Sequence, residues 1–516
     1  MSTDELPGVF PFTRGDSASG PDPEKWFSTY YSGAGTSQDT NALFRDRFMG
    51  ADGTPNLLLA MDLPTQVGLD PDHGLSAGEV GKIGVAVSSV DDVQTLFDGI
   101  PLDGVISGTV GNSIGAWTCP LFVLAGELTG VTPERMRIVL QNDPIKEFTG
   151  RGTQMFSPEV AIELAADVVQ FAHHTLGASW KPQYTCSTQM RWGGVSAAQE
   201  IGFGLASMMT YVLAAERRGV TPAAYLSRTD LHMSSDENLI DEIAKFRAAR
   251  RTWAYIVRDH FGRDVADVSP LSITVFTAGN RLTAQRPLNN IVRTTTHVLA
   301  AMLGGVHEML VPGYDEALGL PTKEATSLTN ATKQILFHET GIGTVVDALG
   351  GSLELERRTT AMAEEARYWF DVVQEAGGML GAIESRLIWE HMTTGTYDRQ
   401  REIERGERKI VGLNHGDTAE APPLELFEGN PRAEDDQRRR VEDLRRDRDA
   451  VAVGRALSEL GRAAALKRDD LQHNVVLAVK GAIAARASVG EIFDVLRCEL
   501  GQADSALNAG DRQAVS

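Results

Sequence analysis

The stretches VISGTV at residues 105–110 and RIVLQND at residues 137–143 decide the fold class of this sequence. Each is an apolar run of strand length, and a helical pattern separates the two. Further runs continue the alternation at residues 57–63, 182–189, 271–278 and 305–311. Strands separated by helices pair in parallel through right-handed crossovers. The pattern favours an α/β fold of the (β/α)8 TIM-barrel type over a doubly wound open sheet.

Two of these runs carry small polar residues on one face. By the period-two alternation of a strand, Ser107 and Thr109 share a face, as do Thr185, Ser187 and Gln189. A TIM barrel normally fills its interior with Val, Ile and Leu. The polar faces therefore predict an open barrel lumen through which a ligand passes. The alternative is that these strands lie at a sheet edge with one face in solvent.

Composition divides the chain into three segments. Residues 1–40 are rich in Gly, Pro, Ser and Asp and predict an extended N-terminal arm that is too polar to fold alone. Residues 41–400 contain the predicted barrel. Residues 401–516 change to a linker and charged helices, and the last of these are apolar on one side. Those last helices are expected either to pack on the barrel or to bind a partner.

The balance of 49 basic and 70 acidic residues gives a formal net charge of -21, which disfavours nucleic acid and anionic membranes as partners. The only cysteines, Cys119, Cys186 and Cys498, lack metal-site spacing, so we expect neither a disulfide framework nor a zinc site. No apolar run approaches the length of a membrane span, and the N-terminus lacks a secretory signal pattern. These features predict a soluble, cytoplasmic protein.

Seven separated blocks of the sequence resemble the adenosylcobalamin-dependent acyl-CoA mutases, the family of methylmalonyl-CoA mutase and isobutyryl-CoA mutase. They are AMDLPTQVGLDPDHG (60–74), GEVGKIGVAVSSVDDVQTLFDGIPLD (78–103), LQNDPIKEF (140–148), KFRAARRTWA (245–254), LTAQRPLNNIVRTT (282–295), DEALGLPT (315–322) and QEAGGMLGAIE (374–384). The resemblance extends from about Pro11 to Leu496. It implies a (β/α)8 barrel threaded by the pantetheine of an acyl-CoA, with adenosylcobalamin at the barrel mouth.

The cobalamin-binding domain of this family is flavodoxin-like and is marked by Asp-x-His-x-x-Gly, whose histidine ligates cobalt. No such sequence follows residue 400, where His415 and His473 lie in other contexts, and the similar DPDHG at residues 70–74 belongs to a barrel block. The resemblance therefore implies the large, substrate-binding subunit of a mutase, with no cobalamin-binding flavodoxin-like domain. The expected partner is a separate small cobalamin-binding subunit, and the expected assembly is a heterotetramer or a homodimer of large subunits.

The resemblance also implies roles for individual residues. Gln141, at the carboxyl end of a strand, matches the glutamine that hydrogen-bonds the thioester carbonyl. Arg151 matches the arginine that pairs with the substrate carboxylate in methylmalonyl-CoA mutase, so it favours a carboxylated substrate. The alternative for Arg151 is an internal salt bridge with Glu147 or Glu159. The other expected substrate-binding residues are the CoA-binding arginines Arg14 and Arg228, together with Asn112 and Ser187.

Several positions depart from the family pattern. The general-acid histidine falls on Gln189, which remains a catalytic candidate although a glutamine can donate a hydrogen bond but cannot protonate a carbonyl. The glutamate close to the corrin falls on Trp192, whereas Glu316 keeps the acid expected near the adenosyl group, and both are cofactor-binding candidates. The other changed positions are Pro21, Thr188, Thr274, Phe276 and Pro312.

Three functions fit these observations. In the first, the chain is an isomerase that catalyses the radical carbon-skeleton rearrangement of a short branched acyl-CoA, for which Arg151 favours a carboxylated substrate. In the second, it is a non-catalytic barrel subunit of a heteromeric mutase. The third is an unrelated barrel aldolase or lyase, which requires a catalytic lysine at a strand end, with Lys146 the nearest candidate. Retention of Gln141, Arg151, Arg14 and Glu316 favours the active mutase.

Overall fold

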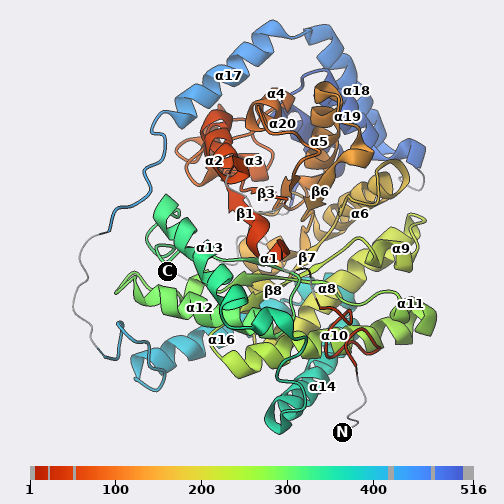
Figure 1. Ribbon diagram of the computed structural model, residues 1–516. Coiled ribbons are helices and arrows are strands. Elements are labelled where there is room, and N and C mark those ends of the chain that lie inside the picture. Colours follow the sequence, from red (N-terminus) through yellow and green to blue (C-terminus); the bar gives the residue numbers. More distant parts are fainter. Residues whose placement is uncertain are drawn as a thin grey trace. The chain divides into compact units, whose positions relative to one another are not determined.

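The computed structural model describes residues 6–20, 22, 24–49, 54–416, 424–466 and 471–503 of the chain (Figure 1). The chain forms two compact units, each assembled from segments that are far apart in the sequence. Unit 1 comprises Met1–Thr29, Thr185–Thr210 and Asp230–Glu428, and unit 2 comprises Tyr30–Tyr184, Tyr211–Thr229 and Gly429–Ser516. This division differs from the predicted segment boundaries at residues 40 and 400, because the helices after residue 429 share a core with the first half of the chain.

Unit 2 is built on a four-stranded sheet with the strand order β1-β3-β5-β6. The strands are β1 (Thr29–Ser32), β3 (Asn56–Leu59), β5 (Ile106–Thr109) and β6 (Arg137–Leu140). β3 pairs with β5, and β5 with β6, in parallel, so that Leu59, Thr109 and Leu140 lie side by side at the carboxyl edge. The close approach of β5 to β6 requires glycine at position 108, since a Cβ atom on Gly108 would lie 1.7 Å from the carbonyl oxygen of Val139.

Helices cover this sheet and supply most of the apolar core of unit 2. The described helices are α2 (Ser37–Met49), α3 (Leu63–Gln66), α4 (Val90–Leu96), α5 (Gly115–Thr129), α6 (Pro158–Thr175), α9 (Pro222–Leu226), α17 (Ala433–Asp447), α18 (Ala450–Ala465), α19 (Val475–Ala484) and α20 (Val489–Leu500). A two-stranded parallel sheet, β2 (Ala34–Gly35) with β4 (Gly84–Val85), lies in the same unit.

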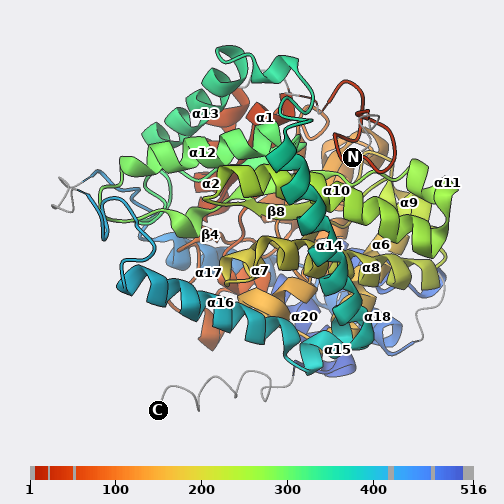
Figure 2. The same cartoon turned by 90° about the horizontal axis from the view of Figure 1, so that it is seen from below.

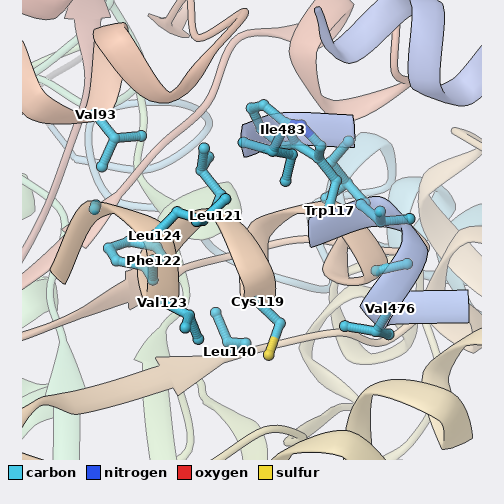
Figure 3. Close-up of a cluster of buried hydrophobic side chains, with 14 of the residues drawn as sticks. Val93, Trp117, Cys119, Leu121, Phe122, Val123, Leu124, Leu140, Val476 and Ile483 are labelled. Atoms are coloured by element: carbon cyan, nitrogen blue, oxygen red, sulfur yellow. The ribbon is translucent and has the colours of Figure 1, made fainter. Parts of the chain in front are cut away.

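The core of unit 2 joins the first half of the chain to its C-terminal helices. α5 is buried from Gly115 to Gly126, which explains why its sequence is apolar around the whole helix. It packs against α19, and Trp117 of α5 shares one core with Val476 and Ile483 of α19 (Figure 3). Of the two expectations for the last helices, packing on the rest of the chain is therefore the one observed.

The segment DPDHG at residues 70–74 has a structural role in unit 2. The carboxylate of Asp70 accepts hydrogen bonds from Ser488 Oγ (2.5 Å) and Gly490 N (3.0 Å), so it caps the N-terminus of α20. Arg445 of α17 donates to the same carboxylate at 2.7 Å. A carboxylate at this position satisfies backbone N–H groups that have no partner within the helix. The segment thereby ties the loop after α3 to the C-terminal helices.

Unit 1 contains a second four-stranded sheet, with the order β7-β8-β9-β10, in which all neighbouring pairs are parallel. The strands are β7 (Thr185–Cys186), β8 (Leu231–Ser235), β9 (Ile273–Thr277) and β10 (Glu308–Leu310). The described helices are α1 (Glu24–Ser28), α7 (Thr188–Trp192), α8 (Ala197–Arg217, which continues into unit 2), α10 (Leu239–Phe261), α11 (Arg263–Asp267), α12 (Asn289–Leu303), α13 (Lys323–His338), α14 (Leu353–Glu375), α15 (Gly378–Glu384) and α16 (Leu387–Glu404). The long helices α10 and α14 pack against each other (Figure 2).

Residues 6–20, within the predicted N-terminal arm, are anchored in unit 1. Arg250 of α10 is 2% exposed and donates hydrogen bonds to the carbonyl oxygens of Phe12 (3.1 Å) and Thr13 (3.4 Å). The ring of Phe10 lies edge-on to that of Tyr255, with 5.3 Å between the centroids. The arm is thus held on α10 through hydrogen bonds to its main chain and through an aromatic contact.

The predicted α/β class with parallel sheets is confirmed. Each predicted strand run contains an observed strand, namely β3, β5, β6, β7, β9 or β10. β8 was missed, because its sequence LHMSS is short and half polar although all five residues are buried. None of the helices in the described ranges is long and apolar enough to cross a membrane.

The core face and the solvent face of α19 provide a matched pair of substitutions. Replacing Ile483, which is 1% exposed, by Ala is predicted to lower the free energy of unfolding by about 2–5 kcal/mol, because a cavity remains in the core. Replacing Leu477, which is 40% exposed, by Ala is predicted to change it by about 0.5 kcal/mol or less. Urea unfolding followed by circular dichroism measures both values. Equal effects of the two substitutions would show that α19 is not part of the unit 2 core.

Candidate active site

The carboxyl edge of the unit 2 sheet brings together three predicted site residues, Asn112, Gln141 and Arg151. Asn112 follows β5, and Gln141 directly follows β6; both side chains are buried. The backbone of Gln141 is fixed on two sides, because its N–H donates to Thr109 O at 3.0 Å and its carbonyl accepts from Tyr184 N at 3.3 Å. Ligands of parallel α/β proteins bind at this edge, where loops follow the strands.

Lys146 lies at the centre of this group and is completely buried. Its ammonium group donates a hydrogen bond to the Oε1 atom of Gln141 and another to Gly111 O at 2.9 Å. The carboxylate oxygen Oε1 of Glu147 lies 3.5 Å from the same nitrogen. The Nε2 group of Gln141, in contrast, donates no hydrogen bond within the part of the chain that the structure describes. The glutamine therefore presents an available donor at the end of β6.

Glu147 begins a single π-helical turn, η3 (Glu147–Arg151), that follows β6. Its Oε2 atom accepts a hydrogen bond from Thr153 N at 3.2 Å and another from the hydroxyl of the same threonine. The carbonyl of Thr153 in turn accepts from Asn112 Nδ2 at 3.2 Å. The loop after β5 and the turn after β6 are thereby joined through polar groups. Turns of this rare type occur often at functional sites.

The guanidinium of Arg151 emerges from the end of the π-helical turn and is only partly buried. Its side chain is 31% exposed, and its NH1 atom lies 4.0 Å from Glu147 Oε1, which is the limit for an ion pair. Among the described residues it has no other carboxylate partner. The predicted alternative of an internal salt bridge is thus realised only as this long contact to Glu147. Most of the donors of Arg151 remain available to an anion.

Arg228 lies elsewhere in unit 2 and donates to main-chain carbonyls. Its Nε group bonds Trp180 O at 2.8 Å, its NH2 group bonds Gly177 O at 2.9 Å, and both terminal nitrogens reach Ala172 O at 3.5 Å. Burial lowers the pKa of this guanidinium. Arg228 thus binds main-chain carbonyls at and beyond the C-terminus of α6. It makes no contact with Gln141, and its predicted CoA-binding role stays a prediction.

In unit 1, β7 ends at Cys186, so the prediction that Thr185, Ser187 and Gln189 share one strand face is wrong: Ser187 is the N-cap of helix α7, and Gln189 lies within that helix. The Ser187 hydroxyl is fully buried and donates to His232 O at 3.0 Å, so its proton is engaged by β8. Gln189 is partly exposed, and its Oε1 atom lies 2.9 Å from the sulfur of Cys186. Neither side chain is paired with a histidine or a carboxylate among the described residues. Gln189 accordingly offers a hydrogen bond and no acidic proton.

Trp192 ends α7 and forms an aromatic wall with Phe276 of β9. The two rings are perpendicular with centroids 5.4 Å apart, and both side chains are partly exposed. The indole Nε1–H donates to Ser234 Oγ at 3.0 Å. Asn280 of η4 (Gly279–Arg281) donates to the carbonyl of Trp192 at 3.1 Å. The tryptophan is therefore fixed to β8 and to the turn after β9.

A network of buried charges surrounds the carboxyl end of β8 and was not predicted. Asp236 accepts from Arg281 at 3.0 Å and lies 3.4 Å from Arg191 of α7. Although burial alone would raise the pKa of this carboxyl, the two arginines hold it far below its ordinary range. A second centre pairs Lys245 with Glu200 at 2.8 Å, and both side chains are completely buried. The sequence separations between these charges are too long for a local pattern to reveal.

Glu316 lies beside η4 and carries a carboxyl group with a raised pKa. Burial, followed by the neighbouring Asp315, raises the pKa of Glu316 to about 7. A Cβ atom on Gly279 would lie 3.4 Å from Glu316 Oε1, so the glycine leaves this carboxyl close to the backbone of η4. Within the described ranges no cation pairs with it. Since Asn280 of the same turn touches Trp192, η4 connects the two cofactor-binding candidates.

Arg14, in the N-terminal arm, shares its carboxylates with another arginine. It lies 3.8 Å from Asp347 and 3.7 Å from Glu356. Arg247 of α10 pairs with the same two groups at 3.0 and 2.8 Å. A ligand phosphate would therefore compete with two carboxylates for Arg14. This arginine belongs to unit 1, and its predicted contact with CoA stays a prediction.

The remaining predicted lumen residues are buried in their own units. Ser107 donates to Leu57 O at 2.9 Å, whereas Thr185 Oγ1 has no hydrogen-bond partner among the described residues. Thr109 is also buried at the end of β5. A common lumen for these side chains stays a prediction, and so does the effect of Pro21, which lies outside the described residues. The other changed positions, Thr188, Thr274 and Pro312, are buried.

Comparison with known proteins identifies the family of the chain. A family model described as methylmalonyl-CoA mutase matches residues 1–502. The methylmalonyl-CoA mutase of Rhizobium meliloti (strain 1021) is 34% identical over 497 residues, which cover 95% of this chain and 68% of the relative. The corresponding values are 32%, 96% and 68% for that of Escherichia coli (strain K12), and 31%, 97% and 66% for the mitochondrial enzyme of Homo sapiens. The chain belongs to the methylmalonyl-CoA mutase family and is an isomerase of the acyl-CoA mutase type.

The family is generally cobalamin-dependent, which raises the question of whether the observed residues fit such a group. The partly exposed Trp192–Phe276 pair and the unpaired carboxyl of Glu316 fit the rim of a large, mostly apolar ring system with polar side groups. In the described ranges, no group of three or more His, Cys, Asp and Glu side chains is arranged to hold a free metal ion.

Glu316 is predicted to make the stability of the chain depend on pH. Because its folded-state pKa of about 7 exceeds the ordinary value of 4.5, its contribution to stability is complete below pH 4.5 and is lost as the pH rises through 7. The free energy of unfolding of the parent, minus that of Glu316→Gln, should therefore fall across this interval and stay constant above it. Urea unfolding at a series of pH values measures the difference. A difference that is flat or that rises would contradict the raised pKa.

Proposed function

We propose that this chain is the large, substrate-binding subunit of an adenosylcobalamin-dependent mutase that rearranges the carbon skeleton of a short, carboxylated acyl-CoA. We also propose that the two parallel sheets close into one (β/α)8 barrel. In both sheets, strands that are consecutive or nearly consecutive in the chain are neighbours, which is the order that a barrel requires. The acyl group would lie at the carboxyl edge of β5 and β6, where Asn112, Gln141 and Arg151 meet.

The available amide donor of Gln141 is the observation on which this proposal chiefly rests. The Nε2 group lies at a strand end, inside a buried polar cluster, and has no partner among the described residues. A thioester carbonyl is an acceptor that would satisfy it, and its oxygen would gain negative charge as the carbonyl group is polarised during the rearrangement. A donor that is already in place stabilises such charge without reorganisation. Gln141 would therefore bind the substrate and assist its reaction.

Arg151 supports a carboxylated acyl group. Its guanidinium has one long contact with Glu147, and its side chain keeps 31% of its surface exposed. Closure of the site around a substrate would remove the remaining water from these donors. An unpaired guanidinium then costs several kcal/mol, whereas a carboxylate can form two parallel hydrogen bonds with it. A dicarboxylate thioester such as methylmalonyl-CoA meets this requirement, and isobutyryl-CoA does not.

The proposed cofactor is adenosylcobalamin, held mainly by a separate small subunit. When bound, it supplies the radical chemistry that a carbon-skeleton rearrangement needs. On this chain, Trp192 and Phe276 would form an apolar wall and Glu316 would offer a hydrogen bond, because its raised pKa keeps it partly protonated near pH 7. The buried donors of the substrate site would hold the thioester and exclude water.

A non-catalytic barrel subunit of a heteromeric mutase is the second candidate function. The observation in its favour is Gln189, which carries no transferable proton and lies next to Cys186 and not beside an acid or a base. Such a subunit would keep the fold of the family but would not catalyse the rearrangement. Turnover by this chain in the presence of a cobalamin-binding subunit separates the two candidates.

We predict that Arg151 determines the preference for a carboxylated substrate. Arg151→Gln should weaken the binding of methylmalonyl-CoA by about tenfold or more, since a hydrogen bond to a charged group contributes about 1.5–3 kcal/mol. The affinity for isobutyryl-CoA should stay unchanged. Isothermal titration calorimetry measures both affinities, with Arg135→Gln, a change at an exposed arginine of the same unit, as the matched control. If the parent already prefers isobutyryl-CoA and the Arg151 variant keeps that preference, the dicarboxylate proposal fails.

We predict that this chain does not ligate the cobalt of adenosylcobalamin by itself. Its sequence after residue 400 contains no Asp-x-His-x-x-Gly, so no histidine is expected to replace the lower base of the cofactor. Titration of the purified chain with adenosylcobalamin, followed by absorbance, should show no change to a histidine-ligated spectrum until a small cobalamin-binding subunit is added. A tight, stoichiometric change with this chain alone would contradict the two-subunit proposal.

A further inference from the structure

Which end of the Gln141 amide faces a ligand decides what the residue can do. A primary amide has an acceptor, Oε1, at one end and a donor, Nε2, at the other, and rotation by half a turn exchanges them. Only the orientation with Nε2 toward the ligand can hydrogen-bond a carbonyl. Some neighbouring group must therefore hold the Oε1 end, or the glutamine would present either face.

Lys146 is the group that contacts the Oε1 end. An ammonium nitrogen is a donor only, so it can donate a hydrogen bond to the oxygen of the amide but cannot accept one from the NH2 group. The Gln141 side chain is thereby restricted to the orientation in which Nε2 is available. This selection follows from the chemistry of the two groups and does not depend on the identity of the ligand.

The position of the Lys146 ammonium is itself fixed. It is completely buried, donates to Gly111 O at 2.9 Å and lies 3.5 Å from Glu147 Oε1. Gly111 belongs to the loop after β5, and Glu147 begins the π-helical turn after β6. The contacts of Lys146 with these two loops thus fix the position of its ammonium group, and through it the position of the Gln141 amide. A buried charge with several partners is costly to displace.

We propose that Lys146 is a positioning residue that orients the Gln141 amide so that Nε2 points to the thioester carbonyl. This inference rests on the proposed function, in which that carbonyl is the ligand of Gln141. It also gives Lys146 a role other than that of an aldolase nucleophile. An amine that attacks a carbonyl needs a free lone pair directed at that carbonyl, whereas this nitrogen directs its hydrogens at Gln141 Oε1 and Gly111 O.

Infrared spectroscopy of a labelled ligand tests the inference directly. Methylmalonyl-CoA carrying carbon-13 at the thioester carbonyl is bound to the full chain without cobalamin, so that no turnover occurs. In the parent, the carbonyl band should shift to lower wavenumber than in free methylmalonyl-CoA, because the Gln141 donor polarises the bond. Gln141→Leu should abolish the shift, and Lys146→Met should abolish most of it. Lys146→Gln, which keeps an N–H donor within reach of Oε1, should retain the larger part.

The matched control is Lys333→Met, which removes another buried lysine, on α13 of unit 1, and should leave the shift unchanged. Circular dichroism checks that each variant is folded. If Lys146→Met does not fold, the Lys146→Gln variant decides the question. A retained carbonyl shift in Lys146→Gln would support the inference, and a lost shift would overturn it. A full shift in Lys146→Met together with its loss in Gln141→Leu would overturn the inference alone. If the parent shows no shift, or Gln141→Leu keeps it, the proposed role of Gln141 fails as well.

Discussion

An ammonium group that is completely removed from water must be surrounded by acceptors, and this constraint organises the candidate site around Lys146. Its partners come from three places: the residue after β6, the loop after β5 and the first residue of the π-helical turn. These places lie close together because β5 and β6 pair in parallel and end at the same level. The geometry of the site therefore follows from the register of β5 and β6 and from the need of the Lys146 ammonium for acceptors in place of water.

The same principle governs unit 1, where buried charges are grouped and not isolated. Arg250 holds the N-terminal arm through main-chain carbonyls, and Lys245 is paired with Glu200 beneath the end of β8. Asp236, between Arg191 and Arg281, connects α7 with the turn η4 that touches Trp192 and Glu316. Buried ion pairs add little net stability, but breaking one leaves an uncompensated charge. The buried ion pairs restrict the surrounding loops to one arrangement, and a binding site requires loops that are fixed in this way.

The sequence was sufficient to predict the strands that form from continuous apolar runs, together with the place of Gln141 at the end of one of them. It was not sufficient for β8, whose polar residues are buried because both faces of the strand are covered. Lys146 was identified as a lysine near a strand end, yet its partner Gly111 is 35 residues away, so its role could only come from tertiary contacts. The arginine and aspartate residues around β8 were missed for the same reason. Isolated charges in a sequence resemble solvated surface, and only the fold brings them together.

The account centres on a thioester bound at the carboxyl edge of β5 and β6. A crystal structure of this chain with methylmalonyl-CoA tests it most directly. We predict that the thioester oxygen lies within hydrogen-bond distance of Gln141 Nε2, with the Lys146 ammonium on the opposite end of the amide and the free carboxylate on Arg151. Density that places the acyl group away from this edge, or that turns Gln141 Oε1 toward the ligand, would contradict the account.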